Sequence, residues 1–584
     1  MLKGCPMTLK KARAVLAAGS FCLAAALGGG AGAAEVYPGC AQPGPTGKVW
    51  YLDPVNGKTP AAGGNGSQTA PWNSLTGVLS FKLPPGYTRP LLSSVPYFHV
   101  VDGKRVYVAD QLGSPPVQPG DTIKLMSGDY GEIVIGDYMQ QVVNPSFVTV
   151  EAAPGQTPVF STLYIRSTNK WVFKGIKVQS LLNTTSNAKR GLVTVTDQGA
   201  SLPTSDIILE NLQISTADST DGWTREQWIT QGRDGFFEWG SAGDGTNGEP
   251  NTTCISMTGS HIRNVRWGVH VMGNNSVFSH NELDHFGDDG LDYGASNISI
   301  SHNYIHDNFD VGDGNHEDVA QGQNGPLQSG VPFNHFSNIL IDSNLAIRQT
   351  DPKLPFPSYL QGIDAFDEDW TNVTVTNNVI VTSACWGIVF SSVHNVKIIN
   401  NTVVADGLLP MPGNCRPNVA LGDKTHEGPS STGGIIRNNI ANTLAIYTAD
   451  PNMTMDHNIC LGIGGKCQII TYLNGKPNWG VYKPGTYGDH NIIDGRGATG
   501  MFVNFDPARF VYLKPSRPAI GAGDSAEAPP VIFDPAKFRY DLRLRPEAPA
   551  IGAGNSAEAP PVDITGAPRA GQVDIGAYQY APLK

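Results

Sequence analysis

A short repeated pattern between residues 260 and 440 restricts the fold of this chain more than any other feature. Four segments, 297–305, 337–347, 372–380 and 395–404, each place two apolar residues around a polar one, then an Asn, then a second apolar pair. Such alternation is typical of a strand with one buried face. The Asn residues that recur in this pattern are Asn281, Asn303, Asn344, Asn378, Asn401 and Asn439.

Two of the intervals between these Asn residues are 22 and 23 residues, and the longer intervals leave room for inserted loops. A period near 22, with several short strands and no helical pattern between them, favours an all-β fold: a single-stranded parallel β-helix. Each turn of the coil would bury its apolar alternates, and the stacked Asn side chains would hydrogen-bond along the axis. A β-sandwich is the competing fold, but it requires no fixed register from one turn to the next.

The same alternation, less regular, occurs upstream at 121–130, 146–155, 169–178 and 205–214. We therefore expect one β-helix domain with an N-terminal cap over 35–445.

A Gly-, Asp- and Trp-rich stretch at 217–252 is expected to be an inserted loop. Residues 446–584 are predicted to hold C-terminal rungs, irregular loops and a closing segment. Within them the sequence of 518–531 recurs almost unchanged at 549–562, 31 residues later. An irregular segment of this kind could pack along the coil or cap its end, where an open rung would offer unpaired backbone groups.

The N-terminus has the organisation of a secretory signal peptide. Its positive charges, which precede an apolar run ending in small residues, are Lys3, Lys10, Lys11 and Arg13. This pattern predicts a signal peptide over 1–34, with cleavage after Ala33 or Ala34. A membrane anchor is the alternative, but the Gly-rich end of the run is weakly apolar for the roughly 20 residues that a spanning helix needs. The mature chain is therefore expected to be secreted or periplasmic.

The charge balance bears on the possible partners. The whole chain has 40 basic and 51 acidic residues, a formal net charge of −11, and loss of the signal peptide would leave 36 basic residues and −15. Such a chain repels polyanions, so nucleic acid and anionic membranes are poor candidates. An acidic polysaccharide could still bind if a divalent cation bridged the two sets of carboxylates. A capped coil is expected to be a monomer.

Six cysteines remain after residue 34, and an even number in an exported protein permits disulfides. Cys460 and Cys467 could close a short loop. No CxxC pair occurs, so a thiolate zinc site is not expected.

Aligning the rungs through their Asn residues predicts one column of outward-facing side chains. The members of this predicted column, in order along the coil, are His270, Asp292, Asp318, Asp364 and Val389. Neighbouring rungs lie about 4.8 Å apart. Carboxylates on neighbouring rungs repel unless a cation, a proton or a basic group intervenes, whereas two rungs, about 9.6 Å, approach the separation used by inverting glycosidases.

The segment GDDGLDY at 287–293 adds three carboxylates around a turn into a strand, Asp288, Asp289 and Asp292. Such a set can converge on one hard cation, which makes Ca²⁺ the expected cofactor. Each of these Asp residues also has a simpler explanation, because Asp is common in turns.

Other residues could serve such a site. His316 and His270 are candidate bases near neutral pH, and Arg348 is a candidate cationic group for a developing enolate. Gln321 could bind a sugar hydroxyl, and Trp370 could stack on a sugar ring, as could Trp223, Trp228 and Trp239.

Three further segments carry a resemblance to a known group of proteins. The sequences at 51–75, 118–130 and 563–580 look like the opening, the first rungs and the closing segment of secreted bacterial right-handed β-helix proteins of the pectate-lyase-like superfamily. The resemblance implies a right-handed coil. It is specific for the fold rather than for the function, because this fold hosts many chemistries.

The Asp-Asp-Gly-x-Asp motif also resembles the calcium site of family 9 pectate lyases. Carried over to this sequence, the resemblance implies that Asp288, Asp289 and Asp292 bind calcium. Those enzymes use a lysine as base, and the only lysines between 260 and 400 are Lys353 and Lys397, neither at a matching place.

Three functions follow as hypotheses. The first is a calcium-dependent polysaccharide lyase that cleaves a uronate-containing glycan by β-elimination. The second is a metal-independent glycoside hydrolase that uses two of Asp292, Asp318 and Asp364. The third is a non-catalytic glycan-binding coil or adhesin. The DPHD motif of alginate epimerases and the GHG and RIK motifs of polygalacturonases do not occur, which disfavours those two families.

Overall fold

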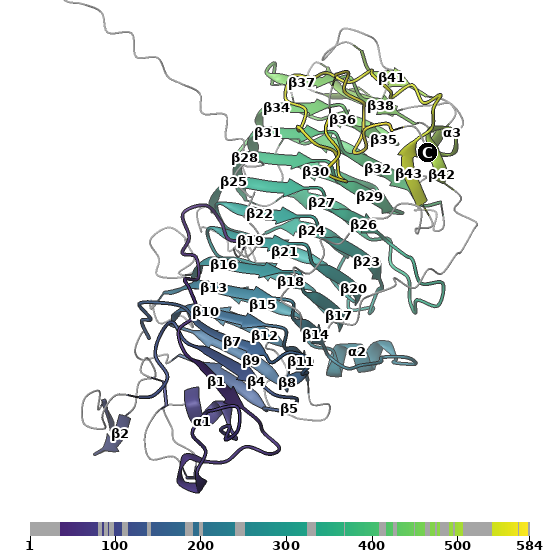
Figure 1. Ribbon diagram of the computed structural model, residues 1–584. Coiled ribbons are helices and arrows are strands. Elements are labelled where there is room, and N and C mark those ends of the chain that lie inside the picture. Colours follow the sequence, from purple (N-terminus) through teal and green to yellow (C-terminus); the bar gives the residue numbers. More distant parts are fainter. Residues whose placement is uncertain are drawn as a thin grey trace, which may run out of the picture.

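The computed structural model of the chain is a long coil of short parallel strands (Figure 1). It describes residues 35–79, 85–86, 91–92, 98–107, 115–136, 142–180, 191–197, 203–239, 252–323, 334–366, 368–407, 416–423, 429–448, 450–461, 468–473, 476–478, 490–494, 497–505, 540–569 and 571–581. The predicted signal peptide, 1–34, lies outside these residues.

Three sheets run along the coil, and each has 13 strands within the described residues. The first sheet consists of β1 (Val49–Leu52), β4 (Thr122–Leu125), β7 (Val148–Ala152), β10 (Asn169–Lys174), β13 (Thr204–Glu210), β16 (Thr252–Thr258), β19 (Ser276–Ser279), β22 (Ile298–Ser301), β25 (His335–Asp342), β28 (Asp369–Thr376), β31 (Val393–Ile399), β34 (Thr432–Arg437) and β37 (Met453–Asp456). The second sheet consists of β5 (Gly128–Asp129), β8 (Pro158–Phe160), β11 (Lys177–Gln179), β14 (Gln213–Ser215), β17 (His261–Val265), β20 (Glu282–Phe286), β23 (Tyr304–Asn308), β26 (Leu345–Ile347), β29 (Val379–Thr382), β32 (Thr402–Ala405), β35 (Ile440–Ala441), β38 (Ile459–Cys460) and β41 (Ile492–Ile493).

The third sheet carries the predicted column of outward side chains. It consists of β6 (Glu132–Ile135), β9 (Thr162–Arg166), β12 (Val193–Thr196), β15 (Phe236–Trp239), β18 (Val269–Val271), β21 (Leu291–Tyr293), β24 (Asp318–Gly322), β27 (Gln361–Ala365), β30 (Trp386–Phe390), β33 (Asn418–Leu421), β36 (Thr443–Ile446), β39 (Gln468–Leu473) and β40 (Lys476–Asn478). Strands pair in parallel along each sheet, except that β39 and β40 are antiparallel. The predicted all-β parallel β-helix is therefore confirmed.

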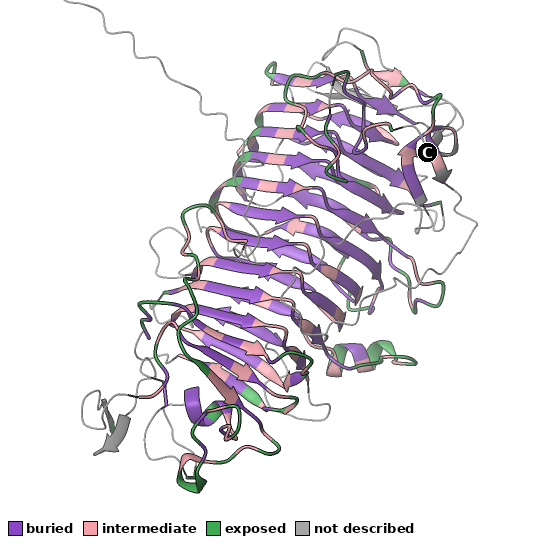
Figure 2. Cartoon of the chain, in the orientation of Figure 1, coloured by how far each residue is buried: buried purple, intermediate pink, exposed green. Residues whose placement is uncertain are grey.

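The interior of the coil is one continuous apolar column. Its core cluster runs from Leu52 in the first rung to Cys460 near the last, and the strands are buried along most of their length (Figure 2). The short helix α1 (Leu75–Leu79) closes the N-terminal end, where its Leu75 and Val78 belong to this core. The other short elements are the 3₁₀ turn η2 (Pro60–Ala62), the helices α2 (Arg225–Gln231) and α3 (Gly497–Met501), and the strands β2 (Phe98–Val101), β3 (Lys104–Tyr107), β42 (Phe502–Phe505) and β43 (Tyr540–Leu544).

The predicted Asn ladder lies at the turn between the first and second sheets. The side chain of Asn378 donates to Ile341 O at 2.9 Å and to Asn401 Oδ1 at 3.0 Å, and its own Oδ1 accepts the backbone N–H of Asn344 at 3.0 Å. This pattern repeats at Asn281, Asn303, Asn344, Asn378, Asn401 and Asn439, and it continues to Asn458 and Asn491, which the sequence analysis did not include.

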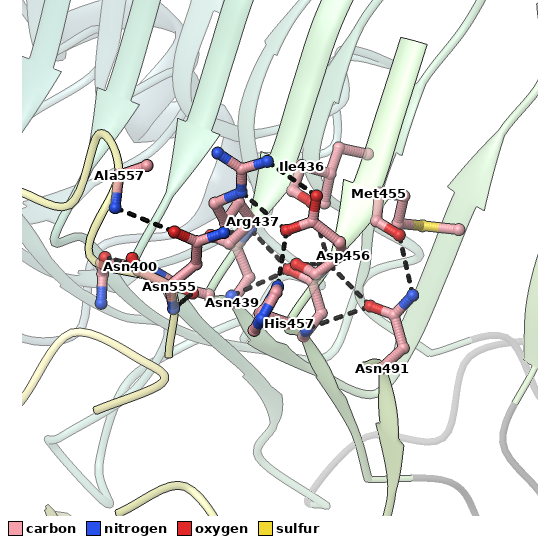
Figure 3. A network of polar contacts seen from close by, with 12 residues as sticks. Asn400, Ile436, Arg437, Asn439, Met455, Asp456, His457, Asn491, Asn555 and Ala557 are labelled. Carbon is pink, nitrogen blue, oxygen red and sulfur yellow. Dashed lines mark hydrogen bonds and ion pairs between the residues drawn. The ribbon is translucent and has the colours of Figure 1, made fainter. Parts of the chain in front are cut away.

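Figure 3 shows the C-terminal end of the ladder, with Asn439 and Asn491 beside the ion pair of Arg437 and Asp456. The residue before each ladder Asn has a positive φ, as at His302 (56°) and Asn400 (58°). Asn and His tolerate this left-handed conformation better than most residues.

Two long-range features hold residues 35–40 against the coil. A disulfide joins Cys40 to Cys254 at β16, and the side chain of Glu35 accepts a hydrogen bond from Ser279 at β19. Cys385 and Cys460 each take part in a further disulfide. Cys467, the predicted partner of Cys460, lies outside the described residues.

The C-terminal segment packs along the second sheet, against outward residues such as Val379, Val404 and Ile440. This segment includes 549–562, the second copy of the internal repeat, whereas 518–531 lies outside the described residues.

The inserted stretch 217–252 is only partly as predicted. It contains α2, whose Trp228 packs on Phe309 with ring centroids 4.6 Å apart, but it also contains β15, a regular member of the third sheet. The alternation of β15 is obscured because Glu238 takes an inward position, opposite Val195. Among the described residues, no helix is long and apolar enough to cross a bilayer.

The ladder provides the first test of this fold. We expect Asn378→Ala to lower the free energy of unfolding by about 3 kcal/mol, because each buried polar group left without a partner costs about 1–3 kcal/mol. Asn395→Gly is the matched control: Asn395 is exposed, has a positive φ of 56°, and its side-chain amide donates to Asn372 Oδ1 at 2.7 Å. Urea unfolding should show a loss below about 1 kcal/mol for the control, and equal losses for both variants would contradict a stabilising role for the ladder.

Candidate functional site

The register of the third sheet places five side chains in one outward column. His270 pairs with Asp292, Asp292 with Gln321, Gln321 with Asp364, and Asp364 with Val389. Their strand neighbours, such as Leu291 and Tyr293, belong to the core, so the members of the column face away from it.

The predicted place of Asp318 in this column is wrong, because Gln321 occupies it. Asp318 pairs with Gln361 instead, three residues earlier along each strand. The side chain of Asp318 nevertheless contacts the column, since its Oδ2 lies 3.4 Å from Gln321 Nε2. The alignment failed because long loops flank β24 and hide its offset from the neighbouring rungs.

Four carboxylates meet on this wall of the coil, and we call them the carboxylate patch: Asp289, Asp292, Asp318 and Asp364. Asp289 Oδ1 accepts the backbone N–H of Asp318 at 2.9 Å, and Asp292 Oδ1 accepts Gln323 Nε2 at 3.0 Å. All four residues are at most 2% exposed. Both side-chain oxygens of Asp364, and Oδ1 of Asp318, receive no N–H or hydroxyl donor, and the two carboxyls lie close enough to share a proton.

Burial and mutual repulsion make these carboxyls hard to ionise. Burial raises the pKa of Asp292 to about 7, with a further contribution from Asp318. Burial and the charge of Asp318 raise the pKa of Asp364 well above its ordinary value, and burial with the charge of Asp292 does the same for Asp289. The patch therefore calls for protons or a cation to neutralise it.

Asp288, the first residue of the motif, lies at the edge of the patch. Its Oδ2 accepts Arg266 Nε at 2.9 Å, and Arg266 also binds Asp313 at 2.6 Å. Burial raises the pKa of Asp288 to about 7, and the charge of Asp313 adds to the effect. The other oxygen, Oδ1, receives no N–H or hydroxyl donor, and the carboxyl of Asp288 lies within hydrogen-bonding reach of that of Asp313.

The two histidines differ in their surroundings. His270 lies between the rings of Trp267 and Phe237, with centroids 5.1 and 4.3 Å away, and its Nδ1 is 3.1 Å from Asp292 Oδ2. Burial lowers the pKa of His270 to about 3, so its ring is neutral at neutral pH. The His316 side chain is 59% exposed, and its Nδ1 lies 2.7 Å from Asp318 Oδ2, a contact that raises the pKa of His316.

Arg348 and Trp370 lie elsewhere. The guanidinium of Arg348 is fully buried, where it pairs with Asp406 at 2.5 Å and donates to Ser358 O at 3.1 Å. These contacts belong to the end of the second sheet.

Trp370 is 0% exposed, and its ring packs in the core 5.3 Å from Tyr293 and 5.0 Å from Phe336. The prediction that Trp370 stacks on a sugar is therefore wrong, and Trp228, only 1% exposed, is wrong for the same reason. Trp223 is half-buried against Trp228, and the side chain of Trp239 lies outside the described residues.

Sequence reasoning missed three residues beside the patch. Gln323 binds Asp292, as given above, and Gln361 pairs with Asp318. Trp386 is 39% exposed at the start of β30. Ile363 of β27 pairs with Ile388 of β30, so Trp386, two residues before Ile388, corresponds to Gln361 on the neighbouring rung. An aromatic residue that opens a rung was the one signal available, whereas nothing in the spacing distinguished the two glutamines.

The donor set of the patch fits a hard divalent cation. Calcium takes 6–8 oxygen ligands, many of them carboxylates, and the patch offers buried carboxylate oxygens that receive no N–H or hydroxyl donor. One ligand atom from each of Asp289, His316 and Asp318 lies within 4.8 Å of the others. Asp292 and Asp364 lie in the adjacent column, close enough for the charges of these carboxyls to raise one another's pKa.

Comparison with known proteins supports the fold. The model of the family described as "Right handed beta helix region" matches residues 244–416. A comparison with curated proteins finds no match for the sequence. The described strands thus form a parallel β-helix, and the family model identifies its central part, residues 244–416, as right-handed.

Several solved structures are similar to the chain at low identity. The structure of pectate lyase Pel9A is 14% identical, with 93% of this chain and 98% of that chain covered and a TM-score of 0.37. The GH136 lacto-N-biosidase from Eubacterium ramulus is 13% identical, with 72% and 68% covered and a TM-score of 0.32. A mannuronic acid-specific family 6 polysaccharide lyase from human gut microbiota is 15% identical, with 62% and 88% covered and a TM-score of 0.26.

The raised pKa values predict how stability depends on pH when calcium is chelated. The folded chain holds protons on Asp288 and Asp292 up to about pH 7, whereas the unfolded chain releases them near about pH 4. Stability should therefore be highest below about pH 4 for these groups and fall by about 1.4 kcal/mol per pH unit for each group between those values.

Chemical unfolding in a chelator at several pH values measures this slope. Asp292→Asn should reduce the slope by the contribution of one carboxyl, about 1.4 kcal/mol per pH unit. Glu210→Gln is the control, because Glu210 lies on the first sheet in an ion pair with Lys174 at 3.1 Å. A wild-type slope that Asp292→Asn leaves unchanged would show that the Asp292 carboxyl does not titrate in this window.

Proposed function

We propose that this protein is an exported, calcium-dependent enzyme that cleaves a uronate-containing polysaccharide by β-elimination. The observation that carries the proposal is the carboxylate patch, in which buried oxygens of Asp318 and Asp364 receive no N–H or hydroxyl donor and face each other. Uncompensated buried charges are expensive, and such a concentration on one outer wall is best explained by a function that uses a cation. The patch and Oδ1 of Asp288 would hold it.

The carboxylates of the patch would hold the calcium ion, and its positive charge would supply stabilisation of the negative charge that develops on the uronate. The proton alpha to that carboxylate must pass to a base, and His316 is the best-placed candidate because its ring is exposed and hydrogen-bonded to Asp318. As this C–H bond breaks, its electron pair forms the new C=C bond and the glycosidic C–O bond breaks with its electrons on the departing oxygen. Water or the protonated His316 returns a proton to that oxygen.

The surrounding side chains would position the glycan and hold the acids in place. Gln321 lies between Asp292 and Asp364 in the column, where its amide could bind a sugar hydroxyl. His270 holds Asp292 from the other side, and Trp386 offers an exposed ring for a neighbouring sugar unit. Arg348 is bound to Asp406, so we assign it a structural role.

A glycoside hydrolase is the second candidate, and one observation favours it. Asp292 and Asp364 lie two rungs apart, about 9.6 Å along the sheet, near the upper end of the separation of inverting carboxylates. Their raised pKa values suit a general acid. Asp318, a member of the same patch, would adjust the ionisation of Asp292 and Asp364.

Export is part of the proposal. The disulfide between Cys40 and Cys254, together with the disulfide-bonded Cys385 and Cys460, fits an oxidising compartment.

A panel of acidic and neutral polysaccharides, each assayed with calcium and with a chelator, tests the proposal. A lyase should produce an unsaturated uronate that absorbs in the near ultraviolet, and chelation should abolish the signal. We expect His316→Ala to lower kcat by about 10²–10⁴-fold, the usual contribution of a general base. Asp364→Asn should mainly raise the calcium concentration needed for half-maximal activity.

Glu210→Gln serves again as the matched control and should keep full activity. New reducing ends without ultraviolet absorbance, formed equally well in chelator, would establish the hydrolase instead. Retention of a glycan without any turnover would leave a binding coil and overturn both enzymatic proposals.

A further inference from the structure

A second group of titratable residues lies on the outer face of the second sheet, on a different wall from the carboxylate patch. Three neighbouring strands, β17, β20 and β23, build it, and Figure 1 shows them side by side. The outward positions form a grid of pairs: His261 opposite Glu282 and Glu282 opposite Tyr304, then Arg263 opposite Asp284 and Asp284 opposite His306. Neither the sequence motifs described above nor the proposed reaction involves these residues.

The side chains of this group contact one another directly, through imidazole nitrogens and carboxylate oxygens. His261 Nε2 contacts Asp284 Oδ2, and His306 Nε2 lies 3.4 Å from Glu282 Oε1. One ligand atom from each of His261, Glu282 and Asp284 lies within 4.8 Å of the others. Asp284, His261 and His306 are only 4–7% exposed, so these side chains are largely shielded from solvent.

The charges of this group do not balance if the imidazoles are neutral. Four carboxylates face three imidazoles and one guanidinium: Glu282, Asp284, Asp307 and Asp351 against His261, His285, His306 and Arg263. With neutral rings, four negative charges would meet one positive charge. Either protons on the histidines or a bound cation must make up the difference.

The hydrogen bonds of His306 suggest which cation. Its Nδ1 lies 2.6 Å from Asp307 Oδ2, and Asp307 is itself fixed by the backbone N–H of Asp351 at 2.7 Å and by the hydroxyl of Thr350 at 2.6 Å. A carboxylate that holds one ring nitrogen while the other faces a further ligand is the usual environment of a metal-binding histidine. The arrangement directs Nε2 of His306 toward Glu282.

We propose that His261, Glu282, Asp284 and His306 form a second metal site, which binds a divalent transition metal of the zinc type. Two imidazole nitrogens and two carboxylate oxygens suit zinc better than calcium, which prefers oxygen ligands alone. The four ligands come from three successive rungs. A bound ion would therefore cross-link β17, β20 and β23 and stabilise this part of the coil, independently of the proposed glycan chemistry.

Calorimetric titration of the full mature chain with Zn²⁺, after removal of metals and in the presence of excess Ca²⁺, tests this site. We expect one zinc ion per chain. His261→Gln should abolish that binding, and Asp307→Asn, which changes the group that orients His306 and removes no proposed ligand, should weaken it by about 10–100-fold. With Co²⁺ in place of Zn²⁺, the wild type should show the visible absorption of a four-coordinate nitrogen and oxygen site.

Two controls separate this site from others. Asp364→Asn, in the carboxylate patch, should bind zinc as the wild type does, and so should His335→Gln, because the His335 side chain is 76% exposed on the first sheet. Zinc binding that His261→Gln leaves unchanged would place the ion elsewhere and overturn the proposal, as would the absence of stoichiometric binding by the wild type. If His261→Gln fails to fold, Glu282→Gln and the cobalt spectrum of the wild type decide the same question.

Discussion

The hydrogen-bonded stacking of one rung on the next is the interaction on which the rest of this structure depends. Parallel pairing sets each strand about 4.8 Å from its neighbour, and the ladder from Asn281 to Asn491 fixes the register at the turn between the first two sheets. A slip of one residue would turn every inward side chain outward. Because the ladder prevents that slip, like positions on successive rungs form columns along the outside of the coil.

Such columns bring like charges together, and the carboxylate patch shows the consequence. Asp292 and Asp364 stand in one column with Gln321 between them, and Asp289 and Asp318 contact each other beside it. Burial prevents water from screening this charge, so the pKa of each carboxyl rises. A rigid coil cannot relax by moving the strands apart. The repulsion must therefore be relieved by protons or by a cation, which links the fold to the chemistry proposed for the site.

The group on the second sheet answers the same problem differently. There the acids alternate with histidines, as Asp284 does with His261 and His306, so each carboxylate has a partner that can carry a proton or share a metal ion. The two walls differ in their donor atoms, and this difference matches the preferences of different metal ions. Oxygen donors alone suit calcium, whereas mixed nitrogen and oxygen donors suit zinc.

The sequence by itself determined the coil and the outward positions of His270, Asp292 and Asp364, because alternation and a repeated Asn are local patterns that survive inserted loops. Only the tertiary structure decided the offset of β24, which puts Gln321 rather than Asp318 in the column, and the burial of Trp370 between Tyr293 and Phe336. It also decided that Arg348 binds Asp406. The physical reason is that loop length does not specify register, and an aromatic ring near a strand end can face either side until its neighbours are in place.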